Sequence, residues 1–290
     1  MKKLLLTLTF LLYGLFANAQ TLTIPDANFK AKLLAASPSN YIAKNLSDTY
    51  FKIDANNDGE IQQSEALQVK RLNVNSSNIS SLEGIQYFTN LSILQCEFNQ
   101  LTSLNVSNNT ALTSLDCNYN QLTSLDVSNN TALIELHCYN NQLTSLNVNS
   151  NTVLFKFDCG GNQLTNLNIS NNTALTNLWC SQNQLTSLNV SNNSALTKLD
   201  CSGNQLTSLN VNSNTALLNF DCSGNQLTNL NISNNSALIT LWCSYNQLTS
   251  LDVSSNTALT SLFCNNTLLT TLNVISNTAL TELRCYNNQL

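Results

Sequence analysis

One residue type that many hydrolytic enzymes need is almost missing from this sequence. Its 290 residues include a single histidine, His137. A Ser-His-Asp or Cys-His nucleophile needs a histidine as its base, and this one directly precedes a cysteine of a repeat, where we expect a surface contact. Asp200 and Asp221 could be imagined as a carboxylate pair for sugar hydrolysis, but we expect them on an open sheet with nothing to raise either pKa. The sequence therefore predicts a protein without enzymatic activity.

Positive charge and long apolar runs are also scarce. Beyond Leu91, three basic residues stand against nine acidic ones, so nucleic acid and anionic membranes are poor partners. The longest apolar run, residues 4–16, is shorter than the roughly 20 residues that span a bilayer. It follows two lysines and precedes an Ala-Asn-Ala sequence, so residues 1–19 are typical of a cleavable signal peptide. We expect a secreted or cell-surface protein without a membrane span.

Cysteine, in contrast, is regular. Ten cysteines recur every 21 residues from Cys96 to Cys285, which indicates one structural unit stacked repeatedly, a solenoid. Each unit, such as residues 112–132, begins with L-x-x-L-x-C-x-x-N-x-L, the leucine-rich-repeat pattern. We expect right-handed coils with a parallel β-sheet on the concave face and short extended segments on the return face. Along each strand Leu115 and Cys117, and their equivalents, point inward because side chains alternate.

The repeated polar and thiol positions are interpreted as structural. Two asparagines recur along the repeats, as Asn120 and Asn130 do in residues 112–132, and their amides can satisfy backbone groups of the turns. Thr267 interrupts the series that contains Asn120. Equivalent cysteines of adjacent coils lie about 4.8 Å apart, but their Cβ vectors are parallel rather than convergent, which disfavours a disulfide. We expect free, buried thiols. A single line of thiolates does not form a tetrahedral metal site.

The first repeat differs and carries a family resemblance. Residues 69–90 form a 22-residue unit with Val74 in the cysteine position, and its S-L-E-G-I-x-x-F-T-N-L sequence runs into Leu91. This sequence resembles the repeat of internalins, surface leucine-rich-repeat proteins of Gram-positive pathogens. Residues 91–290, ten 21-residue repeats of which the last is incomplete, resemble the cysteine-ladder (internalin J-like) type. The resemblance implies an extracellular recognition or adhesion module of unspecified ligand. Similar proteins continue into further repeats and an attachment domain, so a truncated chain is expected.

Residues 20–68 are expected to form a small helical N-terminal cap. Residues 25–36 read as a short amphipathic helix with a proline near its start. Phe29, Leu33 and Leu34 lie on one face of this helix, which we expect to cover the first repeat.

Residues 54–65 contain the one sharp metal-binding pattern, D-A-N-N-D-G-E-I-Q-Q-S-E. It resembles an EF-hand loop, with oxygen donors at positions 1, 3, 5, 9 and 12 and Gly59 at the sharp turn. The alternative is an ordinary Asn-Asn-Asp-Gly turn, which requires neither the first nor the last acid. Room for an exit helix is short, so we expect a structural calcium ion rather than a switch. Its predicted ligands are Asp54, Asn56, Asp58, Gln62 and Glu65, with the backbone carbonyl of Glu60.

Function is expected on the positions that vary between repeats. Both tryptophans and most aromatics beyond Leu91 fall in the column before the cysteine or the two columns after it. Exposed aromatics of this kind are enriched at binding hot spots. We expect binding of an extracellular protein or glycoprotein; the alternatives are carbohydrate stacking on Trp and Tyr beside Asp, a structural spacer, and aromatics that merely stack to stabilise the sheet. The predicted ligand-binding residues are Tyr119, His137, Tyr139, Trp179, Trp242, Tyr245, Phe263, Arg284 and Tyr286.

Overall fold

The computed structural model describes residues 20–290, so the expected signal peptide lies outside the described residues. The chain forms two compact units that divide after Leu122. The first contains the cap and the first coils, and the second contains the remaining repeats. Among residues 20–290 no helix has both the length and the apolar character of a bilayer span.

The cap of the first unit contains the helix that the sequence predicts. Helix α2 spans Ala27–Leu34 and begins after Asp26, whose Oδ1 accepts hydrogen bonds from the N–H groups of Asn28 and Phe29. This is the usual role of an N-cap aspartate. Phe29 and Leu33 are buried, whereas Leu34 is only half-buried. The predicted helix is confirmed, with each end shortened by two residues.

Two links join the cap to the first coil. The second carboxylate oxygen of Asp26 accepts hydrogen bonds from the N–H and hydroxyl groups of Ser80, at 2.8 and 2.7 Å. Strand β1, Ala43–Asn45, pairs antiparallel with β2, Val69–Asn73. These contacts attach the cap to the first repeat, whereas the covering of that repeat by the apolar face of α2 stays a prediction. The sequence did not predict the antiparallel strand.

The coils of the first unit follow β2 in parallel. Strand β3, Ile93–Gln95, pairs with β2, and β4, Ser114–Asp116, pairs with β3. A short 3-10 helix, Ile85–Tyr87, precedes β3. At its N-terminal end Gly84 has φ +107°, and a Cβ there would lie 2.9 Å from Ile24 Cγ1, so the cap packs against a position that only glycine fits.

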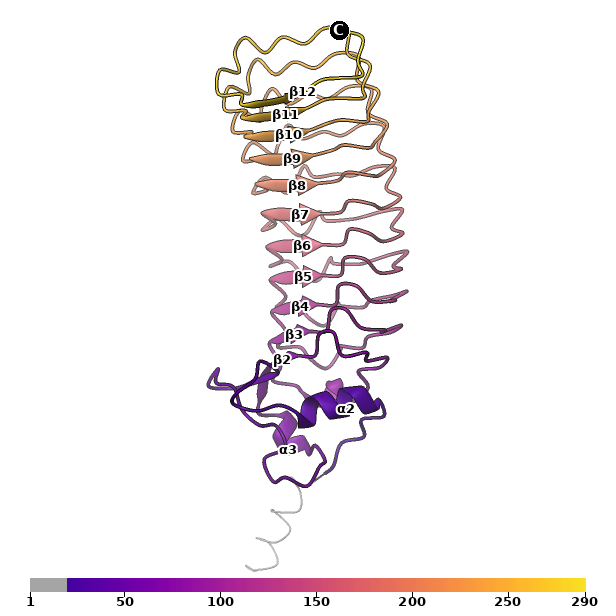
Figure 1. Ribbon diagram of the computed structural model, residues 1–290, viewed down its shortest axis with the longest axis vertical. Coiled ribbons are helices and arrows are strands. Elements are labelled where there is room, and N and C mark those ends of the chain that lie inside the picture. The colour runs from indigo at the N-terminus through magenta and orange to yellow at the C-terminus, as the bar shows by residue number, and fades with distance from the viewer. Residues whose placement is uncertain (1–19) are drawn as a thin grey trace, which may run out of the picture. The chain divides into compact units, whose positions relative to one another are not determined.

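The second unit is a stack of three-residue parallel strands, one per 21-residue repeat (Figure 1). In β5 to β11 each central residue is buried, while the residues on either side of it face outward; in the last strand, β12, the central Leu283 is exposed. On the return side no strand forms within residues 186–190, yet Leu188 and Val190 are buried around an exposed Asn189, as expected for an extended segment. The strands are β5 Glu135–His137, β6 Lys156–Asp158, β7 Asn177–Trp179, β8 Lys198–Asp200, β9 Asn219–Asp221, β10 Thr240–Trp242, β11 Ser261–Phe263 and β12 Glu282–Arg284.

The cysteines line the interior as free thiols. Nine are buried and Cys285 is half-buried. A thiol donates to a carbonyl of the next coil, as Cys201 does to Asp221 O at 3.5 Å. Burial raises the pKa of the Cys264 thiol to about 12 and that of Cys222 further. The prediction of free, buried, structural cysteines is confirmed.

The asparagine series are ladders of side-chain to backbone hydrogen bonds. Asn204 donates to the carbonyls of Cys180 and Cys201, both at 3.0 Å, and its Oδ1 accepts from Leu185 N–H at 3.0 Å. In the second series, Asn193 donates to the carbonyls of Ile169 and Asn172. Each bond satisfies a buried backbone group that no strand pairs. The structural interpretation of both series is confirmed.

Candidate functional site

The last residue of each strand in the second unit forms a column, and we call the outward surface around this column the strand face. Register pairing places each column residue beside the next one. The column reads His137, Asp158, Trp179, Asp200, Asp221, Trp242, Phe263 and Arg284.

Three of the predicted binding residues form an aromatic ladder, which we define as Trp242, Phe263 and Arg284. The rings of Trp242 and Phe263 stack with centroids 5.7 Å and planes 9° apart. The Arg284 guanidinium lies over the Phe263 ring at 4.9 Å, the geometry of a cation–π contact. Trp242 and Phe263 are half-buried rather than fully exposed, because each ring covers its neighbour.

Two tyrosines flank this ladder and are open to solvent. Tyr245 is 60% exposed and Tyr286 is 56% exposed. Tyr245 also adopts a left-handed backbone conformation, φ 55°, where the equivalent positions of earlier repeats carry Gly203 and Gly224. A bulky residue in this conformation has a steric cost that glycine avoids. The same conformation recurs at the equivalent position of other repeats, including Gln182 and Asn266, so it belongs to the turn of the repeat rather than to Tyr245 alone.

The remaining predicted residues do not gather into one patch. His137, Tyr139 and Trp179 are half-buried in the second unit. The Tyr139 ring packs over the next coil, since a Cβ at Gly160 would lie 3.0 Å from its Cδ2.

Tyr119 lies in the first unit and stacks on Phe98, with ring centroids 4.3 Å and planes 10° apart. Phe98 was not among the residues that the sequence predicted for binding. Phe98 occupies the same column as Tyr119, one repeat earlier, and this position could have identified it as a candidate binding residue.

A hollow of about 380 Å³ lies on the strand face between Trp179 and Trp242. Its polar lining comes from the two strands between them, with Lys198 and Asp200 on β8 and Asn219 and Asp221 on β9. The sequence predicted both tryptophans as ligand-binding residues, and it involved aspartates only in the carbohydrate alternative, without assigning Asp200 or Asp221 to the site. Strand register brings all of them to one place.

Asp221 corrects one expectation from the sequence. Burial raises the pKa of this carboxyl above its ordinary value, the charge of Asp200 adds to the rise, and hydrogen bonds from Ser223 oppose it. The expectation that nothing on the sheet would raise either pKa was therefore wrong. The cause is the partial removal of the carboxylate from water on folding.

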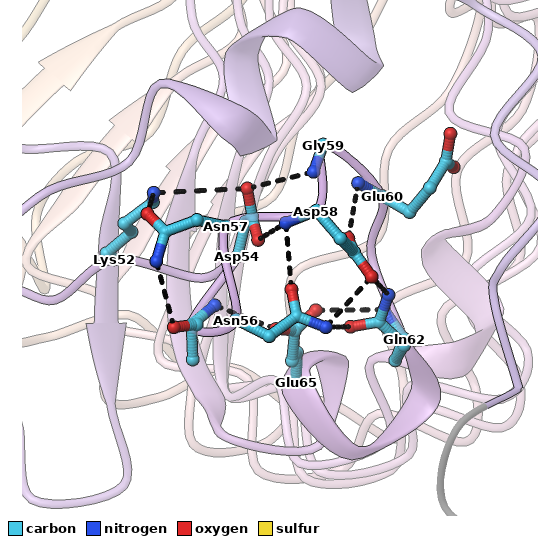
Figure 2. A network of polar contacts seen from close by, with 10 residues as sticks. Lys52, Asp54, Asn56, Asn57, Asp58, Gly59, Glu60, Gln62 and Glu65 are labelled. Carbon is cyan, nitrogen blue, oxygen red and sulfur yellow. Dashed lines mark hydrogen bonds and ion pairs between the residues drawn. The ribbon is translucent and has the colours of Figure 1, made fainter.

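The loop at residues 54–65 is closed by its own polar groups (Figure 2). Asp54 and Glu65, at its two ends, are only 5% and 8% exposed. Asp54 accepts hydrogen bonds from the N–H groups of Asp58 and Gly59, at 3.2 and 3.4 Å. Glu65 accepts from Ala55 N–H at 2.7 Å and from Gln62 N–H at 3.0 Å.

The middle of the loop is held through Asp58. Its Oδ2 accepts from the amides of Asn56 and Gln62, at 2.9 and 2.8 Å, and its Oδ1 accepts from Glu60 N–H. Within residues 20–290 no three acidic, histidine or cysteine side chains are grouped closely enough to hold a metal ion by themselves. A cation here would also need amide and carbonyl oxygens, which Asn56, Gln62 and Glu60 can supply.

Comparison with known proteins points to one group of structures. No protein-family model matches the chain, and neither does any curated protein. InlJ from Listeria monocytogenes, whose functional domain includes a cysteine ladder, is 33% identical with a TM-score of 0.73; the match covers 93% of this chain. The internalin InlF of the same species is 25% identical, with a TM-score of 0.77, and the match covers 91% of this chain and 76% of InlF.

A leucine-rich-repeat protein of Leptospira interrogans shares the fold at 22% identity, with a TM-score of 0.68 over 76% of this chain and 67% of that protein. The present chain spans 62% of the length of the InlJ chain.

Proposed function

Because the chain is a leucine-rich-repeat protein of the internalin type with a cysteine ladder, we propose that it recognises a protein partner outside the cell through its strand face. The internalin-like fold supports an interaction or adhesion module. The signal-peptide pattern of residues 1–19 supports secretion or display at the cell surface. No catalytic step is part of the proposal.

The observation that carries the proposal is the aromatic ladder with its two exposed tyrosines. Trp, Tyr and Arg are the residue types most enriched at binding hot spots. Here they occupy neighbouring strands, so a partner can contact all of them at once. A glycan would use the same rings, and the same experiment separates it from a protein partner.

The test compares binding by the mature chain and two triple variants on arrays of extracellular proteins and glycans. The first variant carries Trp242→Ala, Phe263→Ala and Arg284→Ala. The control carries three changes at exposed return-side positions, Thr207→Ala, Ser208→Ala and Asn212→Ala. Protein ligands retained by the control and lost by the ladder variant support the proposal, provided both variants melt cooperatively. Binding of only glycans, or equal binding by both variants, contradicts it; the spacer hypothesis predicts no ligand.

We also propose that residues 54–65 bind one calcium ion with a structural role in the cap. Two buried acids at the loop ends and an acid at its centre supply the hard oxygen donors that calcium prefers. The ion would replace amide hydrogen bonds at Asp58 and connect the start of the loop to α3, Gln63–Ala66. Extracellular sites work at dissociation constants of about 10⁻⁴ to 10⁻³ M.

Calcium titration tests this second proposal. At 10 mM calcium, affinities in this range raise the free energy of unfolding by about 1.4 to 2.7 kcal/mol. Asp54→Asn should abolish that increase, and Glu83→Gln, a change at an exposed acid outside the loop, should retain it. Magnesium serves as the ion control. If calcium changes neither the melting temperature nor the heat of titration, the loop is an ordinary turn.

A further inference from the structure

The hollow on the strand face is bounded at one end by Trp242, and only one face of that ring is available to a ligand. Phe263 stacks on the other face. Strands β9 and β11 flank β10 on opposite sides, so with Phe263 on β11 the free face is turned toward Asp221 on β9. A flat group resting on this face lies about one strand spacing, or roughly 4.8 Å, from the indole. It would therefore sit over Asp221.

Two carboxylates lie in the hollow at adjacent positions of the column. Asp200 and Asp221 are register partners on β8 and β9. In each, Oδ1 accepts both the N–H and the hydroxyl of the serine two residues later. Within the described part of the chain, no hydrogen bond involves Oδ2 of either aspartate. One oxygen of each carboxylate is thus available to a donor from outside.

Among residues 20–290, no cation forms an ion pair with Asp200 or Asp221. Two other cations of the strand face are paired, with Lys156 2.8 Å from Glu135 and Arg284 2.7 Å from Glu282. Lys198, at the rim of the hollow, is exposed and forms no ion pair within 4.0 Å among residues 20–290. Two like charges held side by side with partial burial favour a cationic ligand.

The ladder itself shows which cation suits these rings. At its far end Arg284 lays its guanidinium over Phe263 at 4.9 Å from the adjacent strand. Guanidinium stacks on aromatic faces, and its planar fork can donate to two carboxylates at once, which an ammonium point charge does less well.

We propose that the hollow receives one arginine side chain of the protein partner. Its guanidinium stacks on the free face of Trp242 and donates to Asp221 and Asp200. This inference rests on the proposed function and specifies the chemistry of the partner. It differs from the aromatic-ladder proposal because it assigns the aspartates, rather than the rings alone, as recognition residues.

The test uses Nα-acetyl-arginine amide as the probe, followed through the two indole N–H resonances of the chain, which has two tryptophans. Nα-acetyl-lysine amide and a neutral disaccharide are the comparison probes. We expect arginine amide to shift the Trp242 indole resonance in a saturable manner, lysine amide to bind more weakly, and the disaccharide to leave the resonance unchanged.

Four variants test which charges of the hollow determine arginine binding. Asp221→Asn, with or without Asp200→Asn, should weaken binding about tenfold or more, since hydrogen bonds to charged groups contribute about 1.5–3 kcal/mol. Lys198→Gln should strengthen binding by removing the competing cation. Asp158→Asn is the matched control: Asp158 occupies the same column and bonds the N–H of Gly160 two residues later, but lies outside the hollow. Its arginine affinity should equal that of the wild type.

An unshifted Trp242 resonance, equal affinity in the Asp200→Asn/Asp221→Asn variant, or a larger response to the disaccharide each overturns the arginine proposal. The same aspartate variant on the protein array separates this failure from failure of the proposed function. If the natural partner needs the aromatic ladder but binds the aspartate variant normally, strand-face recognition stands and the arginine assignment is wrong.

Discussion

Trp242 and Phe263 stack face to face across neighbouring strands, with ring centroids 5.7 Å and planes 9° apart. This contact gives the strand face its shape, because it covers one side of the indole and leaves the other toward Asp221. The same stacking contact could stabilise the sheet without any ligand, which is the simplest alternative to a binding role.

Replacing Phe263 by leucine should lower the free energy of unfolding by about 0.5–1.5 kcal/mol through loss of the aromatic pair. Urea denaturation of Trp242→Leu, Phe263→Leu and the double variant measures the coupling between the rings. Coupling near zero would mean that the stack contributes nothing to stability. If these leucine variants lose stability but bind the ligand normally, the sheet-stabilising hypothesis is correct.

Asp221 should destabilise the fold at neutral pH. Burial raises its pKa above the ordinary value of 3.8, so the folded state holds the proton more tightly than the unfolded state, and stability falls as pH rises between the two pKa values. Asp221→Asn should therefore raise the melting temperature at pH 7, and the gain should shrink below about pH 4.

Asp252 provides a comparison of opposite sign. Hydrogen bonds from the Ser254 side chain and N–H lower its pKa, so its contribution is present above the unfolded pKa and is lost as pH falls through the folded one. Asp252→Asn should not raise stability at pH 7. Equal pH profiles for the two variants would contradict both assignments.

Thr267 marks the weak rung of the asparagine ladder. Its hydroxyl has one proton to share between the Cys264 carbonyl and Asn288 Oδ1. Asn246, one repeat earlier, bonds the preceding coil twice: it donates to Cys222 O and accepts from Leu227 N–H. Thr267→Asn should add the equivalent bonds one repeat later, to Cys243 O and from Leu248 N–H, and stabilise the protein by about 0.5–2 kcal/mol. Asn246→Thr should destabilise it. A destabilised Thr267→Asn variant would show that the surroundings are adapted to threonine.

The buried thiols should be inert in the folded protein. With a pKa of about 12 for Cys264, about one thiol in ten thousand is ionised at pH 8, and the thiolate is the reactive form. A maleimide or aromatic disulfide reagent should modify Cys285, which is half-buried, long before the others. In urea without reductant all ten should react; a smaller number would reveal disulfides.

Much of the molecule could be predicted from the sequence because its repeats are periodic. The cysteine spacing and the recurring asparagines predicted the parallel stack, the free thiols and both ladders. Helix α2 followed from its apolar spacing and the proline before it. Strand β1 could not be predicted, because Ala-Lys-Asn has no strand signature and pairs only through contact with β2.

The sequence by itself determined which residues become neighbours. A 21-residue period with one buried face allows a single register, so the order of residues in the column follows from the repeat spacing alone. Only the tertiary structure decided how the outward side chains are oriented and packed against one another. Trp179 and Trp242 stand three repeats apart in sequence yet line one hollow, and burial raises the pKa of Asp221 between them. These features depend on rotamers and on neighbours from several coils, which no local pattern encodes.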